Sequence, residues 1–230
     1  MNYIRKSESR GKADFGWLQS RHSFSFGNYY DEQHMGVSAL RVINDDLVMP
    51  GQGFAEHGHR DMEIISYVTE GALKHKDSTG NEFVVPAGDV QRMSAGRGVM
   101  HSEFNASDQE QVKFLQIWIQ PDVLNITPSY EQKSIQQQGP LTVLVNPKGD
   151  DGALSINQNA SLSRLVLKQG ESFRFSTDDQ IGYLHLINGQ LSAQNHVFQE
   201  GDGFAIEAEK NFEVKAVTDM EALWFDLPKP

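Results

Sequence analysis

The sequence predicts an all-β protein made of two β-barrels in tandem. Amphipathic helical periodicity is scarce along the 230 residues, and short runs rich in Val, Ile, Phe and Tyr alternate with turn residues at close spacing. A strand–turn–strand pattern from the first half of the chain also recurs faintly in the second half, which favours two jelly-roll-like barrels of similar design.

The predicted strands follow the runs of β-branched and aromatic residues. They cover residues 22–26, 37–43, 64–69, 72–76, 82–85, 113–120, 162–168, 182–187 and 222–225. Turns are predicted where Asn, Asp, Gly and Ser gather between these runs, because such residues tolerate turn conformations. These clusters occur at residues 44–46 (NDD), 70–71 (EG), 78–81 (STGN) and 188–189 (NG).

The two barrels are predicted to occupy residues 1–135 and 136–230. A polar, turn-prone stretch at residues 121–140 is interpreted as the connection between them. Gly88 and Asp89 in the first half, and Gly201 and Asp202 in the second, close a turn before an apolar run. Their agreement in order and approximate spacing favours a duplication.

Composition excludes several classes of function. The formal net charge is −11, from 31 acidic and 20 basic residues, and such a surface repels the phosphate backbone of nucleic acids. No stretch approaches the roughly 20 apolar residues that span a bilayer, and the first residues lack the apolar core of a signal peptide. With no cysteine, disulfides and thiolate ligands are excluded. We therefore expect a cytoplasmic protein that binds neither nucleic acid nor membrane.

Two pairs of residues carry the strongest chemical signal. His57 and His59 lie two apart in GQGFAEHGHRDME (51–63), and His101 and Glu103 lie two apart in MSAGRGVMHSE (93–103). In an extended segment residues two apart point to the same face, so each pair can hold a cation at the usual distance of about 2.1 Å. Three imidazoles and a carboxylate leave one or two positions open on a metal that binds five or six ligands. Open positions favour a catalytic metal over a structural one.

These segments resemble a known family. The first is similar to the first cupin motif, and residues 80–88 (GNEFVVPAG) resemble the start of the second, although Gln91 stands where a cupin histidine is expected. The 54–63 and 93–103 segments and residues 115–118 (LQIW) instead resemble pirins, and most closely short bacterial pirin-like proteins, some of which are quercetin 2,3-dioxygenases. The likeness extends to Trp17, residues 22–31 (HSFSFGNYYD) and residues 225–228 (FDLP). The fold it implies is a bicupin.

The resemblance implies that His57, His59, His101 and Glu103 bind one divalent transition metal. Iron is the expected metal, and nickel, manganese, copper, zinc and cobalt are alternatives, since His and carboxylate ligands suit them all. Glu63 occupies the carboxylate position of the first cupin motif. In pirins that ligand comes from the second pair, so we expect Glu63 to orient an imidazole or to serve the structure.

By the same resemblance, the leading hypothesis is a dioxygenase that cleaves a flavonol such as quercetin with dioxygen and releases carbon monoxide. In it Glu103 is both a ligand and the general base that takes the proton of the substrate's 3-hydroxyl group. The side chains of Phe54, Phe104 and Met93 are candidates for an apolar wall around the rings, and Gln116 is either a polar group near the metal or a simple core residue. The alternative is a pirin-like regulatory protein whose metal controls binding to a protein partner, and another cupin reaction on a different small substrate is a third reading.

The other histidines are given structural roles. His22, with Phe24 and Phe26, is interpreted as part of a core-facing strand, and His34 and His75 as solvated. His185 and His196 are interpreted as partly buried or surface residues. In the second half, Ser176 and Asp178 stand where His57 and His59 stand in the first, so the C-terminal barrel is predicted to be metal-free.

Overall fold

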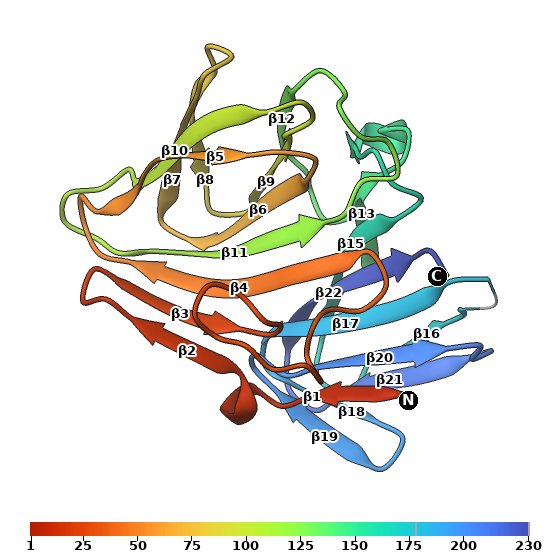
Figure 1. The fold of residues 1–230 in the computed structure, drawn as a ribbon. Helices are drawn as coiled ribbons and strands as arrows, with labels where there is room; N and C mark the ends of the chain where they lie inside the picture. Colours follow the sequence, from red (N-terminus) through yellow and green to blue (C-terminus); the bar gives the residue numbers. More distant parts are fainter. Residues whose placement is uncertain (178, 230) are drawn as a thin grey trace. The chain divides into compact units, whose positions relative to one another are not determined.

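The computed structural model describes residues 1–177 and 179–229. Within them the chain forms 22 strands and two short 3-10 helices, η1 (Ser7–Ser9) and η2 (Asp150–Gly152), so the all-β prediction is confirmed (Figure 1). Neither described helix has the length or the apolar character that crossing a bilayer would need.

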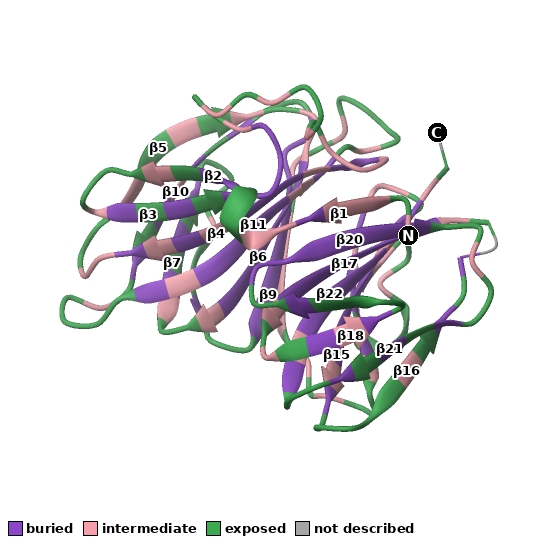
Figure 2. Ribbon diagram, turned by 90° about the horizontal axis from the view of Figure 1, so that it is seen from below, coloured by how far each residue is buried: buried purple, intermediate pink, exposed green. Residues whose placement is uncertain are grey.

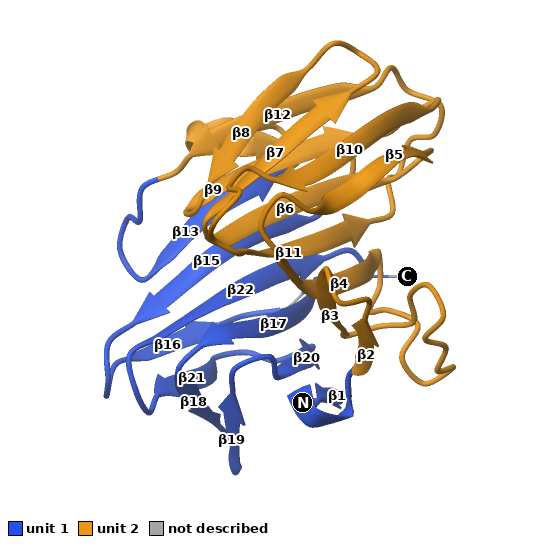
Figure 3. Cartoon of the chain, turned by 90° about the vertical axis from the view of Figure 1, so that its left-hand side faces the viewer, with its two compact units in different colours: residues 1–10, 136–146, 159–230 blue, residues 11–135, 147–158 orange. Residues whose placement is uncertain are grey.

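The chain divides into two compact units (Figure 3). Unit 1 contains residues 1–10, 136–146 and 159–230, and unit 2 contains residues 11–135 and 147–158. The predicted boundary between residues 135 and 136 coincides with one of the points where the chain passes between units. The units differ from the predicted halves in two short segments. Residues 1–10 belong to unit 1, where Tyr3–Arg5 pairs with residues 203–205. Residues 147–158 belong to unit 2 and contact it through bonds such as that from Arg92 Nε to the Ser155 carbonyl (2.7 Å).

Unit 2 consists of two antiparallel sheets in a jelly-roll-like arrangement. The larger sheet has the order β12-β9-β6-β11-β4-β3-β2, and the smaller has the order β5-β10-β7-β8. The strands of the larger sheet are β2 (Gly11–Asp14), β3 (Leu18–His22), β4 (Leu40–Val48), β6 (Glu63–Glu70), β9 (Asp89–Ser94), β11 (Val112–Ile119) and β12 (Ser129–Ser134). Those of the smaller sheet are β5 (Gly53–His59), β7 (Ala72–Asp77), β8 (Glu82–Pro86) and β10 (Val99–Asn105). The short strand β14 (Leu154–Ser155) lies in the 147–158 segment.

Alternation along the strands of the smaller sheet decides what faces the interior of unit 2. In β7, Leu73, His75 and Asp77 are buried and the lysines between them are exposed. In β10, His101 and Glu103 are buried and Phe104 is exposed. A period of two is what a pleated strand imposes when one face is covered and the other is wet.

Unit 1 repeats the plan of unit 2. Its larger sheet runs β1-β20-β17-β22-β15-β13, and its smaller sheet runs β16-β21-β18-β19. The larger sheet contains β1 (Tyr3–Arg5), β13 (Leu141–Asn146), β15 (Ser161–Leu167), β17 (Ile181–Asn188), β20 (Gly203–Glu207) and β22 (Met220–Leu227). The smaller sheet contains β16 (Ser172–Phe175), β18 (Gln190–Ala193), β19 (His196–Gln199) and β21 (Phe212–Ala216).

The order of the strands supports the predicted duplication. β9-β6-β11-β4 in unit 2 corresponds to β20-β17-β22-β15 in unit 1, and β5-β10-β7-β8 corresponds to β16-β21-β18-β19. The turns before β9 and β20 both contain a glycine with positive φ, Gly88 at 89° and Gly201 at 80°. The same positive-φ conformation, which glycine adopts without steric cost, therefore occurs at the corresponding turn of each unit.

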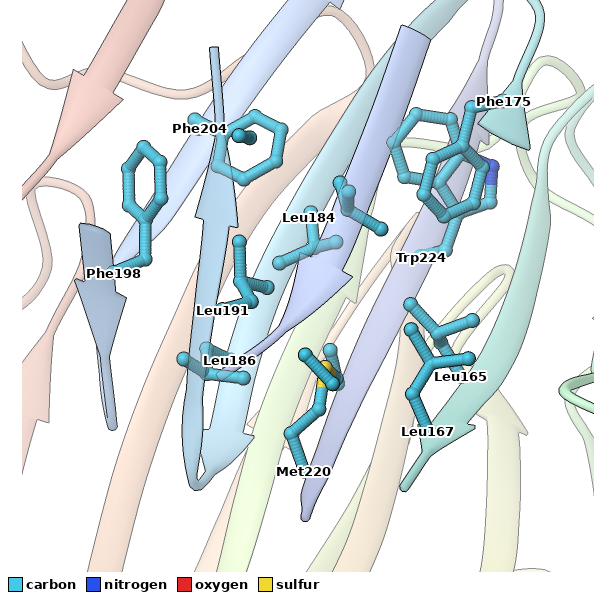
Figure 4. Packing of buried hydrophobic residues seen from close by; sticks show 14 of the residues in the cluster. Leu165, Leu167, Phe175, Leu184, Leu186, Leu191, Phe198, Phe204, Met220 and Trp224 are labelled. Atoms are coloured by element: carbon cyan, nitrogen blue, oxygen red, sulfur yellow. The ribbon is translucent and has the colours of Figure 1, made fainter. Parts of the chain in front are cut away.

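The interior of unit 1 is apolar. Leu184, Phe204 and Trp224 belong to one cluster of buried side chains drawn from both of its sheets (Figure 4). Figure 2 colours most of β17, β20 and β22 as buried, in agreement with their burial patterns. Burial of this apolar surface is the main stabilising contribution to the unit.

Three predictions about elements are wrong. The turn at residues 44–46 lies inside β4, and the strand at 22–26 ends at His22, where β3 ends. The connection at 121–140 contains β12, which pairs with β9. At β4 and β12 polar residues form a strand, because one face of that strand lines a polar interior or packs at a sheet edge rather than in an apolar core.

Candidate metal centre

Three imidazoles meet on the inner side of the smaller sheet of unit 2. His57 and His59 come from β5, and His101 comes from β10, where it pairs directly with His57. Ring centroids are 4.5 Å apart for His57 and His101, and 4.8 Å apart for the other two pairs. One nitrogen from each ring lies within 4.8 Å of the others. The structure thus brings together the three histidines that the sequence singled out.

A β-bulge in β5 aims these side chains. Across the strand pair, His101 lies opposite His57 and Glu103 lies opposite Phe54, so three steps along β5 match two along β10. The two intervening residues of β5 are exposed, and Phe54 and His57 both line the interior cavity. Bulges of this kind redirect side chains beside functional sites.

The hydrogen bond of His57 fixes its tautomer. Its Nδ1 lies 2.8 Å from the Ala55 carbonyl oxygen, which can only accept, so the hydrogen is on Nδ1 and Nε2 of the neutral ring has a free lone pair. That Nε2 lies 3.1 Å from Nε2 of His101. Two nitrogens bound to one metal at about 2.1 Å and at right angles are about 3 Å apart, so this pair already has the spacing of neighbouring ligands.

The pKa values of two rings favour the neutral form that binds metal. Burial, with the neighbouring His101 and His57, lowers the pKa of His59 to about 4. Burial, with His57 and His75 nearby, lowers the pKa of His101 to about 3. Both rings are therefore neutral at pH 7, as metal ligands must be. The donor set fits a divalent transition metal.

Glu103 reaches the same interior and is held by three neutral side chains. Its Oε1 accepts bonds from Gln91 Nε2 (2.9 Å) and Ser66 Oγ (3.1 Å), and its Oε2 accepts one from Gln116 Nε2 (2.7 Å). Glu103 is 1% exposed, so these donors replace the water that a carboxylate requires. They fix the orientation of the carboxylate beside the imidazoles.

The three donors form part of a polar row across the larger sheet. Gln91 of β9 pairs with Ser66 of β6, Ser66 with Gln116 of β11, and Gln116 with Asn44 of β4. The expectation that Gln116 faces inward near the metal site is met, and its core-lining alternative is set aside by its bond to Glu103. The row went unrecognised in the sequence because single Ser and Gln residues in strands carry no distinctive spacing.

A buried His75–Asp77 pair lies beside the three imidazoles. His75 is 0% exposed, so the expectation that it is solvated is wrong. Its Nε2 lies 3.1 Å from Asp77 Oδ2, and its ring stacks on Tyr130 with centroids 4.7 Å apart. Burial alone would raise the pKa of Asp77, but hydrogen bonds from Thr79 and Asn81 bring it well below its usual range. The Asp77 carboxylate thus holds the His75 ring in place.

His75, His101 and Glu103 form a second group whose ligand atoms lie within 4.8 Å of one another. His75 does not line the cavity, whereas His57, His59 and Glu103 do. The second group therefore reaches the cavity through Glu103 alone. Among the described residues, the group of His57, His59 and His101 has two of its imidazoles on the cavity, so a metal held there would be the one that a substrate could reach.

A cavity of about 560 Å³ adjoins the three imidazoles within unit 2. Aromatic side chains form much of its wall, and exposed Lys12 and Phe15 mark the side open to solvent. The residues that line it are Lys12, Ala13, Phe15, Trp17, Leu18, Ser20, His22, Phe26, Gly27, Asn28, Tyr29, Asn44, Asp46, Phe54, His57, His59, Glu103, Gln116 and Trp118. A space of this size and character suits a flat aromatic molecule.

Several predicted positions need correction. Of the three expected wall residues, Phe54 lines the cavity, but Phe104 faces outward and Met93 is buried in a separate cluster with Ile64 and Val99. Alternation explains Phe104, because its neighbour Glu103 faces inward. His22 is buried on β3 and faces inward, as expected, and its side chain also lines the cavity.

Glu63 serves the structure. Its Oε2 accepts hydrogen bonds from Ser94 Oγ (2.9 Å) and the Asn157 backbone N–H (3.3 Å), and its Oε1 accepts one from Asn157 Nδ2 (3.3 Å). It is 1% exposed and holds the 147–158 segment within unit 2. Of the two roles expected for it, these contacts favour the structural one.

The remaining histidines lie outside this group. His34 is half-buried near Asp31, so it is less solvated than expected, and His196 is exposed at the start of β19. His185 is fully buried in β17. Asp178 lies outside the described residues.

Both halves of the chain match known proteins. Residues 3–119 match the family model described as Pirin, and residues 143–227 match that of the quercetinase C-terminal cupin domain. The chain is 44% identical to the quercetin 2,3-dioxygenase of Escherichia coli strain K12, over 99% of both chains. It is similar to the crystal structure of the Escherichia coli bacterial pirin YhhW in complex with nickel(II), with a TM-score of 0.95, 43% identity and 99% of both chains covered. Escherichia coli YhaK is similar at a TM-score of 0.77 and 30% identity, with 95% of this chain and 98% of that chain covered.

Proposed function

This chain belongs to the pirin family, with a cupin domain in each half, and from that premise we propose that it is a metal-dependent dioxygenase that cleaves a flavonol such as quercetin. In the proposed reaction the central ring opens, both atoms of dioxygen are incorporated and carbon monoxide leaves. One observation supports the proposal most: the Glu103 carboxylate is fixed beside three imidazoles at a cavity walled by aromatic rings.

We assign the metal to His57, His59, His101 and Glu103. When bound, a divalent cation supplies a Lewis acid that lowers the pKa of a hydroxyl group beside it. The Ala55 carbonyl keeps the lone pair of His57 Nε2 available, and burial keeps His59 and His101 neutral. Iron remains the expected metal, and the nickel complex of the similar Escherichia coli pirin supports a site that also accepts nickel.

Glu103 is proposed as the base that takes the proton of the substrate's 3-hydroxyl group. Each carboxylate oxygen has two lone-pair positions, and Gln116 occupies one of those on Oε2. Ser66 has a single hydroxyl hydrogen but two acceptors in reach, Glu103 Oε1 at 3.1 Å and Gln116 Oε1 at 3.3 Å. When that hydrogen turns to Gln116, a second position on Glu103 becomes free, so the same carboxylate can bind metal and accept a proton.

The aromatic wall holds the substrate rings flat and excludes water. Trp118 lies edge-on to His59 with ring centroids 5.0 Å apart, and Phe54 lies edge-on to Trp17 at 5.2 Å. Rings in such a setting bury large apolar areas at little cost in conformational entropy. The wall therefore orients the flavonol so that its chelating oxygens face the imidazoles and Glu103.

Glu103→Gln tests the proposed base. The substitution keeps the size and one coordinating oxygen, and Gln116 can turn its amide to accept from the new NH₂ group, so the surrounding bonds survive. We expect a variant that retains some metal and still shifts the absorption of bound quercetin, with oxygen uptake about 10²–10⁴-fold slower.

The matched control is Glu63→Gln, which changes a buried carboxylate away from the imidazoles. It should keep its metal and turn over at a rate close to that of the parent. If metal-loaded Glu103→Gln consumes oxygen like the parent, Glu103 is not the base. If Glu63→Gln loses the metal instead, Glu63 is the carboxylate ligand and the assignment to Glu103 fails.

A further inference from the structure

A second group of polar side chains lines the cavity on the larger sheet of unit 2. Ser20 and His22 lie on β3, and Asn44 and Asp46 lie on β4. The register places Ser20 opposite Asp46 and His22 opposite Asn44, so all four share one face. They are 2–6% exposed, and each lines the cavity. We call them the distal cluster.

The ring of His22 is held by contacts on several sides. His22 Nδ1 lies 2.8 Å from Asn44 Oδ1 and 3.3 Å from Ser20 Oγ. The His22 ring is also flanked by Phe26, at a centroid distance of 5.3 Å, and by Tyr29, at 6.4 Å with nearly parallel planes. Side chains held on several sides lose little freedom when a ligand binds, so they favour selective contacts.

The position of the distal cluster gives the cavity a second polar region. Asn44 pairs with Gln116 across β4 and β11, and Gln116 donates to Glu103. His22 is one strand further, so its Cα lies about 10 Å from that of Gln116 at the usual strand spacing. Between the two regions, ring contacts run from His59 to Trp118 (5.0 Å), to Phe26 (5.3 Å) and to His22. An aromatic surface thus connects two polar regions at the separation of a molecule with linked aromatic rings.

The chemistry of the cluster selects hydroxyl groups. A buried carboxylate accepts, an amide both donates and accepts, and a serine hydroxyl does either, so together they match phenolic O–H groups. In unit 1 the strand that corresponds to β4 is β15, and its Leu165 and Leu167 belong to the apolar cluster, so the strand order does not require polar residues there.

We propose that Ser20, His22, Asn44 and Asp46 form a subsite that hydrogen-bonds hydroxyl groups on the substrate ring furthest from the metal. The inference rests on the proposed function and extends it to the substrate class. The cavity selects polyhydroxylated aromatic compounds that have a chelating oxygen pair at one end and phenolic hydroxyls at the other.

Anaerobic binding to the metal-loaded protein tests this subsite without turnover. Trp17 and Trp118 line the cavity, so quenching of tryptophan fluorescence reports occupancy. The two ligands are quercetin, with hydroxyls on its outer rings, and 3-hydroxyflavone, which keeps only the chelating pair. The parent should bind quercetin about 10-fold more tightly, as one or two net hydrogen bonds would give.

Two variants remove the selectivity. Asn44→Leu and, independently, Asp46→Asn should weaken quercetin binding by about 3- to 10-fold and change 3-hydroxyflavone binding less than about twofold. Asp45→Asn is the matched control, because Asp45 lies between them on the opposite face of β4, and it should bind both ligands like the parent. The Asp46→Asn variant preserves side-chain volume, so it keeps the test valid if Asn44→Leu folds poorly.

Two results separate this inference from the proposed function. If the parent binds both ligands equally, or if Asn44→Leu and Asp46→Asn weaken both ligands to the same extent, the subsite is overturned while flavonol binding at the metal stands. If the metal-loaded parent binds neither ligand, the proposed function fails and the subsite fails with it.

Discussion

The two units of this chain share an order of strands but fill it with different side chains. The inward positions of β10 in unit 2 are held by His101 and Glu103, whereas the corresponding strand β21 in unit 1 has Phe212 and Val214 buried. The strand order therefore does not itself create a metal centre. It supplies positions that either bind metal or build a core.

The larger sheets show the same contrast. Neighbouring positions on β9, β6 and β11 carry Gln91, Ser66 and Gln116. Neighbouring positions on β20, β17 and β22 carry Phe204, Leu184 and Trp224, seen packed together in Figure 4. Apolar side chains of many sizes interlock and stabilise unit 1, whereas polar side chains in unit 2 hold Glu103 and border a cavity. Stability and chemistry are thus divided between two copies of one plan.

The largest effect is expected at the imidazoles. The parent should bind one equivalent of divalent metal per chain, and the double variant His57→Ala/His101→Ala should bind none, because a single imidazole and a carboxylate remain. Elemental analysis after saturation and desalting measures this. Two equivalents in the parent would contradict the prediction that unit 1 is metal-free, and metal retained by the double variant would contradict the ligand assignment.

A core substitution in unit 1 should cost stability. Leu184→Ala removes a fully buried side chain from the apolar cluster, so we expect a loss of about 2–5 kcal/mol in the free energy of unfolding. Its counterpart Ser66→Ala in unit 2 should cost only about 1 kcal/mol, the net value of a hydrogen bond. Urea unfolding compares the two. Equal losses would show that both interiors support the fold to the same degree.

Replacing Gln116 of the polar row by an apolar residue should impair metal binding or turnover and leave the fold intact. Gln116→Leu removes the 2.7 Å bond to Glu103 Oε2 but fills the same space with apolar atoms. Metal affinity or turnover should fall about 10–100-fold, as for other groups that orient metal ligands, with the fold retained. Gln116→Glu is less informative, because it adds a second charge. Unchanged metal affinity and turnover in Gln116→Leu would mean that Glu103 needs no orientation by this amide.

Stability of the metal-free protein should depend on pH through His59 and His101. Their pKa values of about 4 and about 3 in the folded chain lie below the ordinary value of 6.5, so the unfolded chain binds protons first as pH falls. Stability is therefore full above about pH 6.5 and decreases down to about pH 4 and below. Thermal unfolding between pH 7 and pH 4 should show a smaller decrease for His59→Gln/His101→Gln than for the parent. Parallel curves would contradict burial of these rings in the neutral form.

The smallest effect on function is expected at Gly11, which packs against the cavity-lining ring of Tyr29. A Cβ at Gly11 would lie 2.4 Å from Cγ of Tyr29, which lines the cavity and stacks on His22. Gly11→Ala should displace this ring and raise KM for the flavonol by about threefold, with kcat and metal content unchanged.

Gly182→Ala is the matched change in unit 1, where a Cβ would lie 2.0 Å from Trp224. It should lower the unfolding temperature and leave KM unchanged, because Trp224 belongs to a core and not to a cavity. A change of KM in Gly182→Ala, or none in Gly11→Ala, would remove the distinction between the two sites.

Alternation within strands made the imidazoles predictable and concealed their neighbours. His57, His59 and His101 stood out because metal-binding residues at a spacing of two are rare by chance. The burial of His75 was not predictable, because Lys74 and Lys76 beside it face solvent. A buried histidine between two lysines has the same local composition as a solvent-exposed segment. Local composition averages over two faces that have opposite environments.

The same averaging explains the error in β4. Asn44, Asp45 and Asp46 have the composition of a turn, yet all three lie within a strand. Asn44 and Asp46 face the cavity, which no local sequence signal reveals. Most strands of regular apolar character, such as β6, β11 and β17, were predictable because a hydrophobic run defines them regardless of what lies opposite.

The extra residue in the β5 bulge could be lost without turning His57 away from the interior, but not without loss of the contact that fixes its tautomer. Deleting one residue at Ala55 would leave a regular strand in which Phe54 and the histidine still face inward, two positions apart. The carbonyl that now receives the Nδ1 hydrogen of His57 would be gone, and the ring could exchange tautomers. Sequence comparisons that align the histidines alone would score such a shortened relative as intact, although it would have lost the contact that presents Nε2 to a metal.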